Sequence, residues 1–363
     1  MGQRFKVFFG ENDPWGFNKP SEEDRLWAIS QKNPASPFSK FIGNERAVKK
    51  LQAVAFDALG RPNHLCRELA FALFGPPSSG KTTLAKLFAQ VVDLPFIEIQ
   101  PRSVKSLDDF VKEMGRVLTI EGIPLEEGRQ RYFIVPPCII FVDEVHALGD
   151  GMVQGLLKAT EYNDAMLATE SGRTLDCYNV CWMIATTDEG KLFDAFRSRF
   201  SPIMLTYLSK LEVAKIVRLS HPDLSSDVCE LIAHYNSRVP RKALEFARYM
   251  KLIRNMKPTI SWEEIAVEVA SDEGIDEYGM SHVHLSILRA LAGGPVAKNR
   301  IVNVTGRKQE EVERYIMPVL LTATPDQAAY VTVTSQGYVL TSAGAEELRK
   351  RGIECGNNEL ESE

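Results

Sequence analysis

The sequence lacks any apolar run that approaches the length of a membrane span, which takes about 20 consecutive apolar residues in a helix. Its start, MGQRFKVFFGENDP, lacks the basic end, the apolar stretch and the small-residue cleavage site of a secretory signal peptide. We therefore expect a cytoplasmic protein that has no membrane partner.

Paired cysteines are also lacking. None of the 6 cysteines stands in a Cys-x-x-Cys pair, and Cys177 and Cys181 have no matching Cys or His pair elsewhere. This spacing argues against a zinc site, and scattered cysteines are typical of reduced thiols.

An excess of positive charge is missing as well, because 43 Lys and Arg residues stand against 48 Asp and Glu residues. Bulk charge therefore gives no general attraction to nucleic acid, and any contact with DNA must be local. What remains is the composition of a soluble globular protein, 44% hydrophobic and 25% charged. The 363 residues are enough for two or three domains.

The pattern of apolar residues predicts three folded parts between an N-terminal extension, residues 1–40, and a polar tail, residues 352–363. Short apolar runs alternate with amphipathic helices over residues 41–206, which favours an α/β fold with a parallel sheet covered on both faces. Residues 207–275 show only helical periodicity and predict a small all-helical domain. Residues 276–351 predict three helices followed by a hairpin, which is the winged-helix pattern.

The expected elements can be given as ranges. The expected strands of the first part are Leu69–Phe74, Phe96–Ile99, Cys138–Val142, Cys181–Ala185 and Ile203–Leu205. The expected helices are Lys81–Val91, Leu107–Val117, Met152–Tyr162, Lys210–Leu219, Ser226–Tyr235, Arg241–Ile253, Trp262–Ala270, His282–Leu291, Ala297–Val304 and Gln309–Leu321. The hairpin is expected between Tyr330–Thr334 and Tyr338–Thr341.

A phosphate-binding loop follows the first expected strand. The segment Gly75-Pro76-Pro77-Ser78-Ser79-Gly80-Lys81-Thr82 matches G-x-x-x-x-G-K-[ST] and opens a helix, which is the context that this motif requires. The backbone N–H groups of such a loop and the helix N-terminus form a cradle for phosphates. The residues expected to hold the nucleotide here are Gly75, Pro77, Ser78, Ser79, Gly80, Lys81, Thr82 and Thr83.

The motif also predicts the cofactors, which are ATP and Mg²⁺. Lys81 is expected to reach the β- and γ-phosphates, and the Thr82 hydroxyl is expected to bind Mg²⁺. Asp143 and Glu144 follow the strand Cys138–Val142, where Asp143 would hold Mg²⁺ through water and Glu144 would act as general base on the attacking water. His146 either supports this pair or simply packs.

Further polar residues follow the next strands. A hydroxyl at the end of Cys181–Ala185 would lie between the γ-phosphate and the acidic pair, and we assign it to Thr186, with Thr187 as the alternative. Arg199, with Arg197 as second choice, suits an arginine finger that reaches the nucleotide of a neighbouring subunit. Arg241 opens a helix and could fold back over the nucleotide as a second sensor.

Taken in order, these motifs resemble those of AAA+ ATPases, and more closely those of RuvB-type motors, which drive branch migration of Holliday junctions. The resemblance runs from about Phe41 to Arg351. Besides the phosphate loop, the matching segments are Phe41-Ile42-Gly43-Asn44, Phe141-Val142-Asp143-Glu144-Val145-His146, Ala159-Thr160-Glu161, Ala185-Thr186-Thr187, Phe196-Arg197-Ser198-Arg199-Phe200, Val239-Pro240-Arg241, Asp276-Glu277-Tyr278-Gly279 and Leu291-Ala292-Gly293-Gly294-Pro295-Val296.

The resemblance implies an AAA+ ATPase domain, a helical lid domain and a C-terminal winged helix. It also implies a homo-oligomer, a hexameric ring, that acts on duplex DNA or four-way junctions. In this family a hairpin ahead of the first sensor strand docks on a junction-binding protein. Residues 163–176 hold that place here, and they are acidic and polar rather than apolar.

The sequence departs from the family in three places. Ser78 stands where the family usually has glycine, residues 119–135 look inserted, and no Lys or Arg occurs from Leu321 to Thr341, where the family's wing carries arginines. Contacts to DNA are then expected from Arg307 and Lys308, because phosphates favour the N-terminus of the helix that follows. Solvated turn residues are the alternative interpretation of this pair.

The sequence thus predicts an ATP-dependent DNA motor of recombination and repair. The alternative is a loader or remodelling ATPase that acts on a protein complex and uses the winged helix as a docking module. DNA-stimulated ATP hydrolysis would separate the two.

Overall fold

The computed structural model describes residues 21–61, 69–118, 121–124, 131–236, 239–324 and 326–355. The chain divides into two compact units, the first of residues up to 76 and 80–205, the second of residues 77–79 and those from 206 onward, and each is described by itself below. Among the described residues, no helix combines the length and the apolar character needed to span a bilayer.

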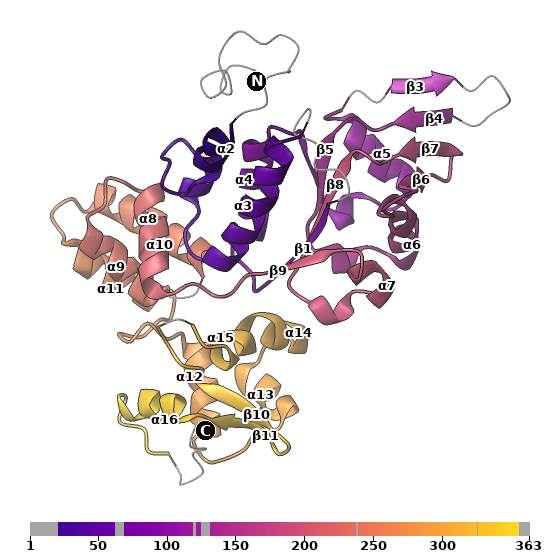
Figure 1. Cartoon of the computed structure of the whole chain (residues 1–363). Coiled ribbons are helices and arrows are strands. Elements are labelled where there is room, and N and C mark those ends of the chain that lie inside the picture. Colours follow the sequence, from indigo (N-terminus) through magenta and orange to yellow (C-terminus); the bar gives the residue numbers. More distant parts are fainter. Residues whose placement is uncertain are drawn as a thin grey trace. The chain divides into compact units, whose positions relative to one another are not determined.

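The first unit is built on a parallel sheet of five strands in the order β2-β5-β8-β1-β9 (Figure 1). All four neighbouring pairs run parallel, which confirms the expected α/β fold class. The strands are β1 (Ala70–Phe74), β2 (Phe96–Ile99), β5 (Cys138–Val142), β8 (Val180–Thr186) and β9 (Ser201–Met204).

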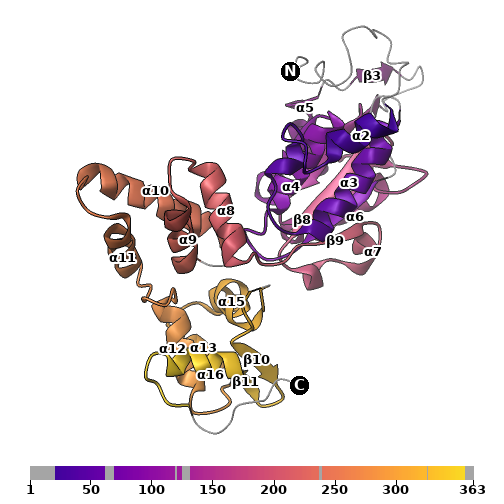
Figure 2. The same cartoon turned by 60° about the vertical axis from the view of Figure 1, so that its left-hand side comes forward.

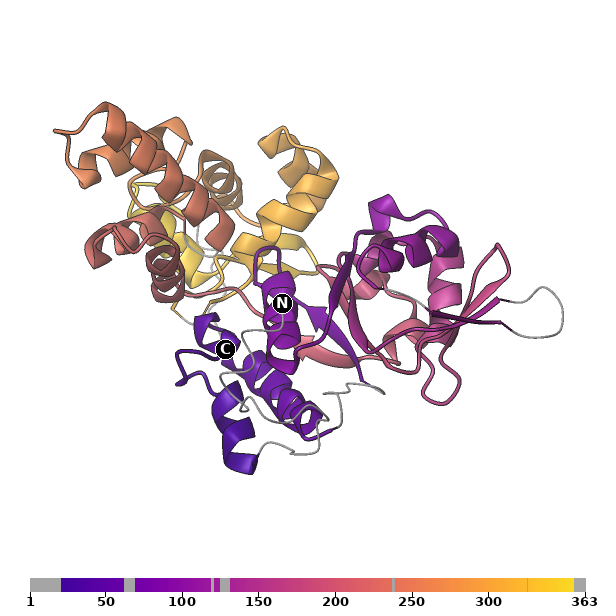
Figure 3. The ribbon, with the colours of Figure 1, turned by 90° about the horizontal axis from the view of Figure 1, so that it is seen from above.

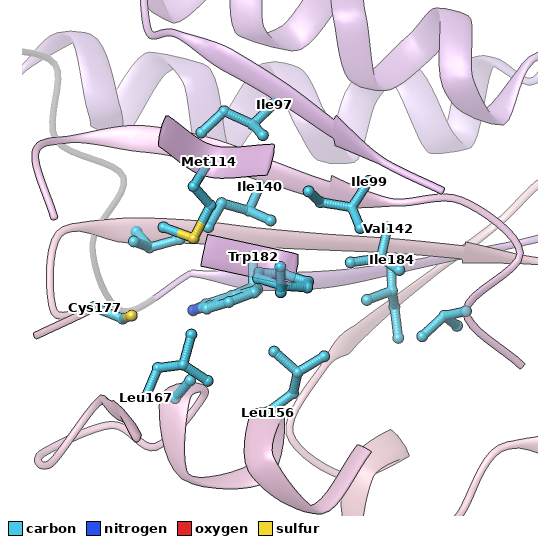
Figure 4. Close-up of a cluster of buried hydrophobic side chains, with 14 of the residues drawn as sticks. Ile97, Ile99, Met114, Ile140, Val142, Leu156, Leu167, Cys177, Trp182 and Ile184 are labelled. Atoms are coloured by element: carbon cyan, nitrogen blue, oxygen red, sulfur yellow. The ribbon is translucent and has the colours of Figure 1, made fainter. Parts of the chain in front are cut away.

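Helices cover both faces of this sheet, and the strand β5 shows why. Its Ile139 and Phe141 pack into one buried cluster, whereas Ile140 and Val142 pack into another, as the alternation of side chains along a strand requires. The first cluster includes apolar residues of α3 (Glu45–Leu59) and α4 (Lys81–Val92). The second, drawn in Figure 4, includes residues of α5 (Leu107–Gly115) and α6 (Asp150–Ala159).

Shorter elements complete this unit. The helices are α2 (Glu22–Ile29), which packs on α3, and α7 (Asp194–Arg197), which precedes β9. The 3-10 turns are Pro37–Lys40, Pro101–Ser103, Val145–Ala147 and Glu189–Lys191.

A second sheet of four strands, in the order β3-β4-β7-β6, was not expected from the sequence. The expected hairpin at residues 163–176 consists of β6 (Met166–Ala168) and β7 (Arg173–Asp176). The insertion at residues 119–135 supplies a second hairpin, β3 (Glu121–Pro124) and β4 (Arg131–Ile134), and β4 pairs parallel with β7. Figure 3 shows the two hairpins side by side at one end of the unit.

The tip of the β6–β7 hairpin is fixed to the N-terminus of α5. The Glu170 carboxylate accepts hydrogen bonds from the backbone N–H groups of Leu107 and Asp108, both at 3.1 Å. In return, Ser171 donates to the Asp108 carboxylate through its backbone N–H, at 2.8 Å, and through its hydroxyl, at 2.6 Å. A carboxylate in this place satisfies N–H groups that a helix leaves unpaired at its start.

The second unit begins with four helices that share one apolar core (Figure 2). They are α8 (Lys210–Ser220), α9 (Ser226–Tyr235), α10 (Pro240–Met256) and α11 (Trp262–Asp272). Reciprocal capping boxes fix the start of two of them, Ser209 with Glu212 at α8 and Ser261 with Glu264 at α11.

The remainder of this unit has the elements of a winged helix around its own core. They are α12 (His282–Leu291), α13 (Lys298–Thr305), α14 (Gln309–Glu311), a π-helical turn (Val312–Ile316), α15 (Met317–Leu321), β10 (Val331–Thr334), β11 (Gly337–Leu340) and α16 (Ser342–Arg349). The strands β10 and β11 form the expected antiparallel hairpin. The expected helix Gln309–Leu321 changes its hydrogen-bond pattern before Pro318, which has no backbone N–H to donate.

Candidate nucleotide site

The phosphate loop leaves the carboxyl end of β1 and opens α4, as the motif requires. A Cβ atom on Gly75 would lie 2.6 Å from the carbonyl oxygen of Leu205, so no larger residue fits there. Gly80 adopts a left-handed φ of 95°, and a Cβ atom there would lie 3.0 Å from the Phe41 ring. Ser78 is also left-handed, with φ 61°, a conformation that costs a residue with a Cβ atom about 1–2 kcal/mol.

Lys81 begins α4 and turns over the loop. Its side chain is only 7% exposed, and Nζ donates to the carbonyl oxygens of Gly75, at 2.9 Å, and Pro76, at 3.0 Å. Burial lowers the pKa of Lys81, while the nearby charges of Glu144 and Asp143 act in the opposite direction. The ammonium group therefore faces the acidic pair from within the loop.

The next residue joins the loop to the neighbouring strand. The Thr82 hydroxyl donates to Asp143 Oδ2 at 3.1 Å, and the backbone N–H of Glu144 donates to Asp143 Oδ1 at 3.0 Å. Burial raises the pKa of Asp143, although the hydrogen bond from Thr82 lowers it. Thr83, one residue further along α4, is exposed. Two oxygen donors of the kind that Mg²⁺ prefers thus lie side by side at the start of the loop helix.

Glu144 is held from the end of β8. It adopts a left-handed φ of 49°, which turns the chain out of β5. Its Oε2 atom accepts hydrogen bonds from the Thr187 hydroxyl, at 3.2 Å, and from the Thr187 backbone N–H, at 3.4 Å. The geometry therefore brings Glu144 together with Thr187, the alternative hydroxyl, rather than with Thr186.

Thr186, the last residue of β8, is fully buried. Its hydroxyl accepts a hydrogen bond from the backbone N–H of Asp188 at 3.0 Å and lies 2.7 Å from His146 Nδ1. The same His146 nitrogen lies 3.3 Å from Glu144 Oε2. His146 is thus placed between the acidic pair and the end of β8, and it does more than fill space.

The two arginines pair with different acids. Arg199 Nη2 lies 3.4 Å from Glu161 Oε1, and the Arg199 side chain is 27% exposed. Arg197 Nη2 lies 2.9 Å from Glu189 Oε1. Within the described residues, Arg199 Nε is buried without a hydrogen-bond partner.

Arg199 lies at the opposite end of the strands from its own phosphate loop. It borders a cavity of about 280 Å³ together with the first residues of β1 and β8, Ala70 and Val180. The phosphate loop instead follows Phe74, at the far end of β1, roughly 15 Å away at the rise of a strand. Arg199 and the phosphate loop therefore lie at opposite ends of the strands.

The remaining predicted residues lie in the second unit. Arg241 is exposed in the first turn of α10, and its role as a second sensor stays a prediction. Arg307 and Lys308 are exposed between α13 and α14, where Arg307 Nη1 lies 3.5 Å from Glu311 Oε1. Lys298, another basic residue of this region, pairs with Glu313 at 2.9 Å.

Comparison with known proteins agrees with this geometry. Residues 71–207 match the model of the ATPase family associated with various cellular activities (AAA). Together with the phosphate loop, the acidic pair and the parallel sheet, this match identifies residues 71–207 as an AAA ATPase domain and the protein as an ATP-hydrolysing enzyme.

Within that class, the chain resembles RuvB over most of its length. It is 26% identical over 330 residues to the Holliday junction branch migration complex subunit RuvB of Thermotoga maritima. The alignment covers 85% of this chain and 90% of that relative. The subunit of the same name from Bdellovibrio bacteriovorus is 25% identical to this chain. The alignment covers 89% of this chain and 94% of that relative.

A solved structure shows the same fold. The Thermotoga maritima RuvB Holliday junction branch migration motor aligns with a TM-score of 0.65 at 22% identity, over 90% of this chain and 98% of the other. The expected resemblance to RuvB-type AAA+ ATPases is thereby confirmed for sequence and fold.

Sequence reasoning gave less weight to two residues that the structure brings into the site. Thr187 is the second choice in the sequence prediction, and the pattern of apolar residues does not say which of the two neighbouring hydroxyls meets the acidic pair. The position of His146 followed from no pattern. The signal that would have raised it is its spacing from Glu144, because residues two apart around a tight turn can meet at one partner.

Proposed function

We propose that this chain is an ATP-driven DNA motor that moves four-way junctions or duplex DNA, in the cytoplasm, as an oligomeric ring. The observation that supports it most is that the resemblance to RuvB, named for Holliday junction branch migration, extends over 85% of this chain and so well beyond the ATPase domain. A shared ATPase domain alone would support ATP hydrolysis but no particular substrate.

In the proposed site, the loop N–H groups and Lys81 bind the phosphates of ATP. Thr82 and Asp143, whose oxygens lie 3.1 Å apart, fit Mg²⁺ as hard oxygen ligands. The ion, when bound, neutralises charge on the β- and γ-phosphates. Glu144 takes a proton from the attacking water, and Thr187 orients the Glu144 carboxylate through the two hydrogen bonds that it donates.

Arg199 is proposed to act on the nucleotide of a neighbouring subunit. Its place at the amino end of the strands keeps it away from its own loop, and its weak pairing with Glu161 at 3.4 Å leaves donors for phosphate oxygens. An arginine finger raises the rate of hydrolysis about 10³- to 10⁵-fold in P-loop enzymes. The number of subunits in the ring, proposed as six, follows from the resemblance alone.

The proposed contact with DNA lies at Arg307 and Lys308. Acidic partners reduce the free positive charge near them, since Arg307 pairs with Glu311 and Lys298 pairs with Glu313. Each subunit therefore neutralises few phosphates, and we expect binding that requires the assembled ring and falls steeply with salt. The hairpin at residues 163–176 is the proposed docking site for a junction-binding protein.

The test is the rate of ATP hydrolysis with and without a four-way junction, at low and moderate salt. We expect DNA to raise the rate at low salt in the wild type. Arg307→Glu with Lys308→Glu should remove the stimulation and keep the basal rate. Lys81→Ala should abolish nucleotide binding, while Glu144→Gln should bind ATP and not turn it over.

The outcome that would refute the motor is a wild-type enzyme that hydrolyses ATP yet neither binds nor responds to DNA at any salt. That result would favour the remodelling ATPase instead, in which the winged helix docks on protein. The observation behind this second candidate is the wing itself, which carries no Lys or Arg from Leu321 to Thr341.

A further inference from the structure

His146 occupies a position that connects the general base to the end of β8. It follows β5 in the turn Val145–Ala147, and its side chain is 9% exposed. Its Nδ1 atom lies 2.7 Å from Thr186 Oγ1 and 3.3 Å from Glu144 Oε2. We propose that His146 is a positioning residue for ATP hydrolysis, which holds the Glu144 carboxylate through an Nδ1–H group that it shares with Thr186. This rests on the proposed role of Glu144 as general base.

The hydrogen bonds around Thr186 indicate where the proton on His146 lies. The backbone N–H of Asp188 donates to the Thr186 hydroxyl at 3.0 Å, and that hydroxyl can donate its own proton to the Asp188 carbonyl oxygen at 3.3 Å. With its proton so used, the Thr186 oxygen is an acceptor for His146. The second neighbour, the Glu144 carboxylate, is an acceptor only, so we assign the proton to Nδ1, which lets both contacts act as hydrogen bonds.

This arrangement fixes one oxygen of the general base and leaves the other for chemistry. Oε2 of Glu144 accepts the hydroxyl and the N–H of Thr187 and lies 3.3 Å from Nδ1 of His146, within reach of the proposed Nδ1–H. These three contacts, from His146 and Thr187, all reach Oε2. Oε1 is therefore the atom that can take the proton of the attacking water, in a plane set by His146 and Thr187.

The shared proton also keeps the free-energy cost low when the Glu144 carboxylate moves away from His146. If Glu144 turns toward water, Nδ1–H keeps its shorter contact with Thr186, and no buried donor is left without a partner. Thr186, for its part, stays bonded to Asp188. His146 thus holds the carboxylate in place while the cost of releasing it stays small.

The experiment compares two substitutions of similar size. In His146→Asn, the amide nitrogen stands close to the place of Nδ1 and can donate the same hydrogen bond, whereas His146→Leu fills the space and donates nothing. We expect His146→Leu to lower kcat about 10- to 100-fold, as the loss of a residue that orients a reacting group does. The KM for ATP and the affinity for ATP should stay within about threefold, and His146→Asn should retain most of the wild-type kcat.

A double-mutant cycle separates positioning from a general structural effect. In a Glu144→Gln background, His146→Leu should lower the residual rate little further, because the group that it positions is already gone. The proposal fails if His146→Leu keeps the wild-type kcat, if His146→Asn is as slow as His146→Leu, or if His146→Leu loses ATP affinity together with kcat. A wild type that hydrolyses ATP no faster than Glu144→Gln would instead refute the role proposed for Glu144.

Discussion

At the scale of single residues, the two threonines at the end of β8 have different surroundings. The Thr187 hydroxyl donates to the Glu144 carboxylate at 3.2 Å. The Thr186 hydroxyl is fully buried, where it is bonded to Asp188 and lies against His146. The strand β8 ends at Thr186, and Thr187 follows it with a different set of partners, so one threonine can serve the reaction while the other serves the fold.

We therefore expect opposite consequences from the same substitution at these two positions. Thr187→Val removes a donor aimed at the general base and should lower ATP turnover about 100-fold. Thr186→Val leaves the backbone N–H of Asp188 without the acceptor that it has in the wild type, removes the nearest contact of His146 Nδ1, and should lower the free energy of unfolding by about 1–3 kcal/mol. Hydrolysis rates and urea unfolding of both variants measure this, and equal effects in both assays would contradict it.

At the scale of elements, the β6–β7 hairpin is tied to α5 through Glu170. The carboxylate supplies an acceptor for two N–H groups that the helix itself cannot pair. The tip of the hairpin is thus held against α5, and β4 pairs with the edge of β7.

Glu170→Ala should cost about 1 kcal/mol in the free energy of unfolding, the usual loss when a helix start loses a capping side chain. The amides of Leu107 and Asp108 should exchange with solvent faster, and basal ATP hydrolysis should not change. The matched control is Glu113→Ala, which removes an exposed pair with Arg116 on the same helix and should have almost no effect. An unchanged exchange rate at Leu107 and Asp108 would show that Glu170 does not cap α5.

A buried ion pair joins α16 to the segment before α12. Arg351, 6% exposed, lies 2.6 Å and 3.1 Å from the two oxygens of Asp276 and 2.8 Å from Glu347 Oε1. Burial raises the pKa of Asp276, but the hydrogen bonds from Arg351 and from the backbone outweigh it, and the net pKa is lowered. A lowered carboxyl pKa stabilises the fold above the unfolded pKa near 4, and that stability is lost as the pH falls through the folded value.

Arg351→Ala should therefore lower the free energy of unfolding at neutral pH by about 3 kcal/mol, because it leaves buried carboxylates without their partner. The difference from the wild type should shrink as the pH falls below about 4. Lys350→Ala, which removes a more exposed pair with Glu347, serves as control and should cost under about 1 kcal/mol. Urea unfolding at several pH values measures the free energy of unfolding of both variants. If the difference between Arg351→Ala and the wild type does not change with pH, the ion pair with Asp276 does not account for it.

The elements also show how far a single sequence can predict this fold. The strand Cys138–Val142 and the helix Ser226–Tyr235 are found at the expected bounds, because the first is a short continuous apolar run and the second repeats its apolar residues at helical spacing. The pairing of β4 with β7 was missed, since it joins residues about 40 apart that show no pattern in common. The helix α16 was missed as well, because its apolar stripe consists of little more than Ala345 and Leu348.

At the scale of the whole molecule, the two halves of the proposed catalytic machinery are at opposite ends of one sheet. Mixing Arg199→Ala subunits with Lys81→Ala subunits should therefore restore part of the activity that each lacks alone. In the mixture, some interfaces combine an intact loop with an intact arginine. The measurement is the hydrolysis rate across mixing ratios, and full hydrolysis per subunit in a verified monomer would overturn action in trans.

The place of Arg199 also has a consequence for assembly. If Arg199 completes the site of a neighbouring subunit, as proposed, that interface joins the arginine end of one subunit to the loop end of the next, so it is heterologous and differs from the interface of a closed twofold dimer. A row of n subunits then has n−1 complete sites, and only closure of the row completes the last one. Activity per subunit should therefore rise with the length of the row and level off where it closes, which makes ring closure itself measurable as a gain in specific activity.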